Sequence, residues 1–104
     1  MANIKEQAAA VNMLPNARLT AAQVINSVFS DGAYANIALG KALSKQNHSE
    51  QDRRFVTELV YGTVKAKGTI DWLLQQLVSR PLGKIEPMIL NILRLGVFQI
   101  YFLE

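Results

Sequence analysis

Two long helical patterns, each with a charged residue on its apolar side, constrain the fold of this chain more than any other feature. The first is DRRFVTELVYGTVK, which starts at Asp52, and the second is PMILNILRLGVFQIYF, which starts at Pro87. Glu58 lies near Phe55 in the first pattern, and Arg94 lies inside an otherwise apolar run in the second. A buried charge requires a partner. The patterns therefore predict two helices joined by an ion pair between Glu58 and Arg94.

The rest of the chain also has apolar residues at helical spacing, and no strand-like alternation competes with it. We therefore expect an all-α fold, a helical bundle of about five helices. Gly62, inside the third predicted helix, indicates close approach of another helix, and Gly32 suits the left-handed end of the first. The expected helices cover about 17–31, 35–45, 50–67, 70–79 and 87 onward, with N-terminal signals at Asn16, Ser49, Thr69 and Pro87.

The length of 104 residues and the 50% hydrophobic content indicate one small globular domain. Residues 1–15 are predicted to be a flexible N-terminal leader, and residues 16–104 to form the helical domain. An apolar helix at the end of a chain needs covering by later elements, and the sequence stops at Glu104. We therefore expect a domain truncated at its C-terminus, from a longer protein, and self-association into a homodimer through the uncovered surface.

Several classes of chemistry are excluded by composition. The chain has no cysteine, which rules out disulfides, thiolate metal sites and cysteine nucleophiles. His48 is the single histidine and falls in a predicted turn, where we expect it to be solvated; one histidine cannot form a zinc site. No glycine-rich phosphate loop and no signal peptide is present. The apolar stretch 85–103 is interrupted by polar residues, which favours a buried helix over a membrane span.

The net charge of +3 permits an anionic partner without requiring one. Lys41 and Lys45 share a helix face, Lys65 and Lys67 end the third predicted helix, and Arg18 opens the first. These five residues are the candidate RNA contacts, with Arg18 and the last two lysines expected to form one patch; an ordinary solvated surface is the alternative.

The aromatic residues Trp72 and Tyr34 are expected to pack inside the domain rather than to stack on bases. Trp72 lies between apolar neighbours in the fourth predicted helix, and Tyr34 follows the turn at Gly32.

Four segments together resemble a known family. They are GAYANIALGKAL, DRRFVTELVYGTVK, IDWLL and ILRLGVFQIYFL, and with Arg18 and Ala22 they cover about residues 17–103. In order and spacing they are similar to the NusB-like N-terminal domain of the Sun/RsmB family of ribosomal RNA methyltransferases. The positive charge is kept at Lys65, where that family usually has arginine.

The resemblance implies an all-α, NusB-like fold and an RNA-binding accessory role in the cytoplasm. The partners it implies are ribosomal RNA and a catalytic methyltransferase domain of the same parent chain. That parent would methylate cytosine C5 in small-subunit ribosomal RNA with S-adenosylmethionine. In that family the chemistry rests on cysteine, so this chain is expected to be non-catalytic and to hold no cofactor. The alternatives are a NusB-type transcription antitermination factor and a protein–protein interaction module.

Overall fold

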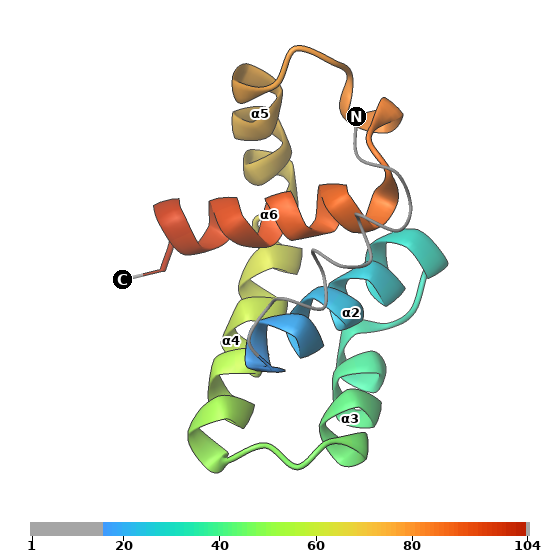
Figure 1. The fold of residues 1–104 in the computed structure, drawn as a ribbon, viewed down its shortest axis with the longest axis vertical. Helices are drawn as coiled ribbons and strands as arrows, with labels where there is room; N and C mark the ends of the chain where they lie inside the picture. Colours follow the sequence, from blue (N-terminus) through green and yellow to red (C-terminus); the bar gives the residue numbers. More distant parts are fainter. Residues whose placement is uncertain (1–15, 104) are drawn as a thin grey trace.

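The computed structural model describes residues 16–103 and confirms the all-α prediction. Its five α-helices and one short 3₁₀ helix appear in chain order in Figure 1. No strand occurs in residues 16–103, and none of the helices there is long and apolar enough to cross a membrane. The predicted leader lies outside the described residues. The elements are α2 (Asn16–Asp31), α3 (Ala35–Lys45), α4 (Glu50–Lys65), α5 (Lys67–Leu77), η1 (Leu82–Lys84) and α6 (Pro87–Tyr101).

Helix α2 is the element on which α3, α4 and α6 pack, whereas α5 packs mainly on α6. Small residues on its inner face allow those neighbours to approach closely: Ala21 and Ala22 are fully buried, with Ile25 beside them. Its buried side chains join those of α4, α5 and α6 in a single apolar core. Burial of that core is the main force that assembles these helices, since isolated helices of this length are marginal in water.

The helix boundaries follow local chemistry at most of the predicted positions. The Ser49 hydroxyl accepts a hydrogen bond from the Asp52 amide at 3.1 Å, which caps α4. Glu86 caps α6 in the same way, accepting from the Ile89 amide at 3.0 Å. Gly32 ends α2 with a φ of +74°, in the left-handed region that favours glycine.

The predicted start of the fourth helix at Thr69 was wrong. Helix α4 ends at Lys65, and α5 begins at Lys67 and ends at Leu77, so only Ala66 separates the two helices. The Ala66 amide still bonds to the Gly62 carbonyl, and the Ile70 amide bonds to the Ala66 carbonyl. The backbone is therefore bent at Ala66 rather than interrupted, and no capping side chain is needed at that point.

Gly62 has the close helix contact that the sequence predicts. A methyl group at this position would collide with the Phe98 ring of α6. Phe98 itself is buried and stacks against Phe102 at a centroid distance of 6.1 Å. The absence of a side chain at Gly62 therefore permits α6 to lie across α4 (Figure 1).

Helix α6 is buried on one side and exposed on the other. It packs on α2, α4 and α5 and buries residues such as Leu95 and Val97. The opposite side is open, with Leu93 and Ile100 exposed seven residues apart on one face. This open face agrees with the expectation of an uncovered apolar surface on the last predicted helix.

Two aromatic predictions were also wrong. The exposed fraction is 63% for Trp72 and 75% for Tyr34, so neither ring belongs to the core. The buried residues of α5 are Ile70 and Leu74, which share a face four residues apart. Trp72 falls midway between them in sequence and therefore on the opposite side of the helix.

Candidate nucleic-acid interface

The most elaborate polar arrangement in the described residues joins α5 to α6. Arg94 donates two hydrogen bonds to Asp71, from Nε to Oδ1 at 2.8 Å and from Nη2 to Oδ2 at 3.0 Å. The Arg94 side chain is only 10% exposed and that of Asp71 22%. Two parallel bonds to one carboxylate fix both the distance and the orientation of the guanidinium. The pair therefore fixes how the two helices meet.

The same guanidinium also connects α6 to α2. Its Nη1 donates to Asn91 Oδ1 at 2.8 Å, and Asn91 Nδ2 donates to Asn26 Oδ1 at 2.8 Å. The Arg94 guanidinium also lies over the Phe29 ring, 5.0 Å from the centroid. Three helices therefore meet at one buried cation with a partner on each side, which meets the requirement for burying a charge.

The predicted ion pair between Glu58 and Arg94 was wrong. Arg94 is buried and paired as expected, but its partner is Asp71. Glu58 is exposed and forms no ion pair among residues 16–103. Its position on α4 faces away from α6, since the buried residues of that helix are Val56, Leu59 and Val60 and their neighbour Thr63.

The environment of Asp71 favours its charged form. Burial alone would raise the pKa of its carboxyl group. The hydrogen bonds from Arg94 and Lys67, together with their positive charges, outweigh that effect and lower the pKa below its ordinary value. Asp71 therefore remains an anion throughout the neutral range.

Lys67 is the predicted RNA contact most involved in the fold. Its Nζ donates to Asp71 Oδ2 at 3.1 Å and lies 5.5 Å from the centroid of the Phe29 ring. Two cations therefore share one carboxylate and one ring, which leaves this junction with a net positive charge. A lysine with two such partners has less freedom to reach a phosphate than a free one.

Arg18 is likewise held inside the domain. Its Nε donates to Gln99 Oε1 at 2.7 Å, and its guanidinium lies 5.2 Å from the centroid of the Phe55 ring. Phe29 is about 16 Å further along α2, at 1.5 Å per residue. The structure therefore does not bring Arg18 to Lys67, and the single patch expected from these residues is not formed.

Lys41 and Lys45 are placed differently. Both are exposed and are the only charged residues of α3, and neither forms an ion pair in the described part of the chain. They line a groove of about 330 Å³ between α2 and α3. The rest of that groove consists of uncharged side chains, among them Val24, Ile37 and Gln46. This pair is the clearest uncompensated positive charge on a helix.

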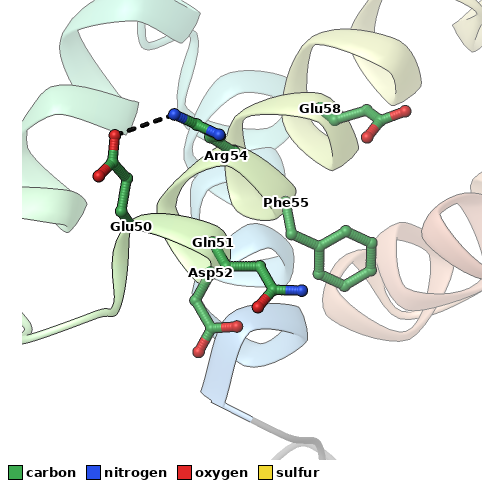
Figure 2. A pocket seen from close by; sticks show the side chains of 6 residues that line it. All are labelled: Glu50, Gln51, Asp52, Arg54, Phe55 and Glu58. Carbon is green, nitrogen blue, oxygen red and sulfur yellow. Dashed lines mark hydrogen bonds and ion pairs between the residues drawn. The ribbon is translucent and has the colours of Figure 1, made fainter.

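The larger hollow, about 790 Å³, lies on α4 and is shown in Figure 2. It is open to solvent and bordered by the carboxylates of Glu50, Asp52 and Glu58. Arg54 offers the only positive charge there, and its Nη2 lies 3.0 Å from Glu50 Oε1, an ion pair drawn as a dashed line in Figure 2. An acidic hollow of this kind repels phosphate, so it is unsuited to nucleic acid. Within residues 16–103 no group of three acidic or histidine side chains could hold a metal ion.

His48 was expected to be solvated, but it is half-buried and has a polar contact. Its Nε2 lies 3.0 Å from the Thr20 hydroxyl, which also donates to Gln46 Oε1 at 3.0 Å. The half-buried imidazole thus ties the loop before α4 to α2, which gives this residue a structural contact.

The chain belongs to the NusB family, whose model matches residues 15–104. Among its relatives, it is similar to one part of several ribosomal RNA methyltransferases. It is 39% identical over 89 residues to a probable ribosomal RNA small subunit methyltransferase B of Synechocystis, a match that covers 86% of this chain and 20% of the relative. It is 36% identical over 72 residues to the probable enzyme of the same name in Bacillus subtilis, covering 69% of this chain and 16% of the relative.

The match to ribosomal RNA small subunit methyltransferase B of Yersinia pseudotuberculosis is 28% identical over 87 residues, covering 84% of this chain and 20% of the relative. The chain thus spans about a fifth or less of the length of these relatives. No solved structure matches the chain significantly.

Proposed function

We propose that this chain is an RNA-binding accessory domain of a cytoplasmic methyltransferase that modifies cytosine C5 in small-subunit ribosomal RNA. Membership of the NusB family and similarity to part of the methyltransferase B relatives support the proposal. In this proposal the domain helps to hold ribosomal RNA while a separate catalytic domain of the same parent acts. The chain itself performs no chemistry.

S-adenosylmethionine is proposed as the cofactor of that catalytic domain, to which it would supply the methyl group. The residues described here do not fit it. Neither the α2–α3 groove nor the acidic hollow on α4 has a glycine in its lining, and a nucleotide-type cofactor usually needs close approach of a glycine-rich backbone.

The structural observation that carries the RNA-binding proposal is the uncompensated charge of α3. Lys41 and Lys45 are exposed four residues apart, with no carboxylate on their own helix or in the groove that they line. The two lysines lie about 6 Å apart along the helix, so both can contact phosphates of one RNA strand. Such contacts supply affinity and orientation but do not read sequence.

The test is RNA affinity measured by fluorescence anisotropy over a series of salt concentrations, with a small-subunit ribosomal RNA fragment as the probe. The unmodified chain should bind the RNA fragment more weakly as the salt concentration rises. The double variant Lys41→Gln/Lys45→Gln should bind more weakly at low salt. Its slope of log K against log salt should be smaller by about 1.4 for single-stranded contacts, which is 0.7 for each lost phosphate contact.

The matched control is Arg54→Gln, which removes a cation that already has Glu50 as its partner. Its binding should stay close to that of the parent chain. The proposal would be refuted if the unmodified chain does not bind the RNA fragment, or if its binding does not depend on salt.

A protein-interaction module is the second candidate, and one observation favours it. The end of α6 exposes a set of apolar side chains that includes Ile100 and Tyr101, at 75% and 56%. A protein partner could cover that surface, and such binding would withstand high salt because it would depend on apolar burial. The salt series therefore separates the two candidates. We propose a second copy of this chain as the protein partner of this surface, which would give a homodimer.

A further inference from the structure

The outer face of α4 and α5 carries two exposed aromatic rings with a lysine between them. Tyr61 is 43% exposed and Trp72 63% exposed, and Lys65 is also exposed. We call these three residues the α4–α5 strip. The net charge of the junction behind it is positive, because Lys67 and Arg94 share the single carboxylate of Asp71.

The three residues lie on one continuous face despite the bend at Ala66. The buried face runs through Val60 and Thr63 in α4 and then Ile70 and Leu74 in α5. These positions are separated by three, seven and four residues, which is helical spacing across the junction. Because the buried face continues from one helix to the next, the face opposite to it continues as well.

The two helices also follow each other in nearly the same direction, as Figure 1 shows. Together they account for about 40 Å at 1.5 Å per residue, and the longest dimension of the molecule is 39 Å. On this axis Lys65 lies about 6 Å beyond Tyr61, and Trp72 lies about 10 Å beyond Lys65.

The helix has a residue without a side chain, Gly68, between Lys65 and Trp72. Gly68 is exposed there, and apart from its chain neighbours and the adjacent helix backbone, no heavy atom lies within 4 Å of the position that a side-chain methyl group would occupy. A planar ring could therefore approach the helix at Gly68 without meeting a side chain of that residue.

We propose that the α4–α5 strip binds single-stranded RNA, with bases stacked on Trp72 and Tyr61 and a phosphate between them contacted by Lys65. The proposal rests on the RNA-binding function above and specifies the form of RNA that this face would take. Aromatic rings are platforms for unpaired bases because every base has a face that can stack. Duplex RNA hides those faces, so the strip selects against it.

The charge distribution favours RNA over a protein partner. The rings of the strip are separated along the helix by a lysine and a glycine, whereas a protein-binding surface typically has a contiguous apolar centre. Glu58 lies on the same side of α4, just before Tyr61, and is exposed. Its carboxylate would repel phosphate and therefore sets one end of the strip.

The experiment titrates the chain with a short single-stranded oligouridine and, separately, with an RNA hairpin of the same length. Trp72 is the only tryptophan, so stacking on it should quench the fluorescence of the protein directly. We expect quenching by oligouridine and much less by the hairpin. Trp72→Ala should weaken oligouridine binding, followed by anisotropy, by about tenfold, as expected for loss of one stacked base.

Three further variants make the result specific. Trp72→Phe keeps a stacking ring and should restore most of the affinity. Tyr34→Ala is the matched control, because it removes a ring that is 75% exposed but lies at the start of α3, away from the strip. Its affinity should match that of the parent. Glu58→Gln should tighten binding modestly by removing a repelling charge.

Unchanged oligouridine affinity in Trp72→Ala, or an equal loss in Tyr34→Ala, would overturn the proposal. If RNA binding survives in Trp72→Ala but falls in Lys41→Gln/Lys45→Gln, the strip is wrong and the RNA-binding function stands. If neither probe nor the ribosomal fragment binds the parent chain, both proposals fail. Oligouridine binding that leaves the fluorescence of Trp72 unchanged would likewise overturn the proposal.

Discussion

Removing the carboxylate of Asp71 is the substitution that tests the fold most directly. Asp71→Asn leaves Arg94 with 10% of its side chain exposed and without its anion. The wild-type carboxylate accepts two bonds from Arg94 and one from Lys67. Each bond to a charged group contributes about 1.5–3 kcal/mol, and stranding one partner of a buried pair costs about 3–5 kcal/mol. Because Asp71 is partly exposed, water offsets some of this, and we expect a loss of about 3 kcal/mol.

The assay is urea unfolding followed by far-UV circular dichroism, with the m-value held as a check on two-state behaviour. Glu50→Gln is the matched control, since it removes a carboxylate from an ion pair whose side chains are both 80% exposed. Its cost should be below about 0.5 kcal/mol. A double-mutant cycle with Arg94→Met should show strong coupling to Asp71. Equal, small losses in Asp71→Asn and Glu50→Gln would refute the role assigned to the buried pair.

The same carboxylate makes stability depend on pH in a definite direction. The folded-state pKa of Asp71 is lowered by Arg94 and Lys67, net of the opposing effect of burial. The contribution of this carboxylate to folding stability is therefore complete above the unfolded-state pKa of about 3.9. That contribution is lost as the pH falls through this value and then through the lower folded-state pKa. The stability of Asp71→Asn, measured by the same urea assay, should fall less steeply than that of the parent below about pH 4. Parallel curves would contradict the assignment.

Three further predictions use the same unfolding assay or sedimentation. Gly62→Ala should destabilise the folded domain by about 1–3 kcal/mol because its methyl group meets the Phe98 ring. The control Gly40→Ala meets no such neighbour and should stabilise the domain by up to about 1 kcal/mol. Equal effects of the two substitutions would refute the contact. Thr63→Val should be neutral or stabilising by about 1 kcal/mol, because the fully buried hydroxyl has no hydrogen-bond partner; a clear loss of stability would indicate an unseen partner. At micromolar concentration the chain should sediment as a concentration-dependent dimer, and Ile100→Glu should shift it to monomer; a monomeric parent at all concentrations would contradict self-association through α6.

The sequence predicts most helix positions because each helix has its own apolar period and end signals. The predicted second helix, 35–45, agrees with α3, and Ser49 caps α4 as its chemistry requires. The bend at Ala66 was missed because Gly68 and Thr69 have stronger turn and cap preferences. The close spacing of Ile70 and Leu74 could have shown that Trp72 lies outside, since a residue midway between two core positions four apart faces solvent.

The ion-pair partner could not be chosen from the sequence in the same way. Periodicity tells which side of a helix is buried, but the choice between Glu58 and Asp71 depends on where α6 crosses the other helices. That crossing is set by the fit of Phe98 against Gly62 and by the bend between α4 and α5, which are properties of the assembled fold. The same reason explains why Arg18 and Lys67 were wrongly placed together.

The central position of α2 has a consequence for synthesis on the ribosome. Its partners include Gln99 and Asn91 of α6, which are bonded to Arg18 and Asn26. These are 81 and 65 residues away along the chain. At about 5–20 residues per second, α2 emerges several seconds before α6 does. Until then the inner face of α2 lacks the packing partners that α6 supplies. Helix α2 therefore cannot complete its packing before α6 has emerged.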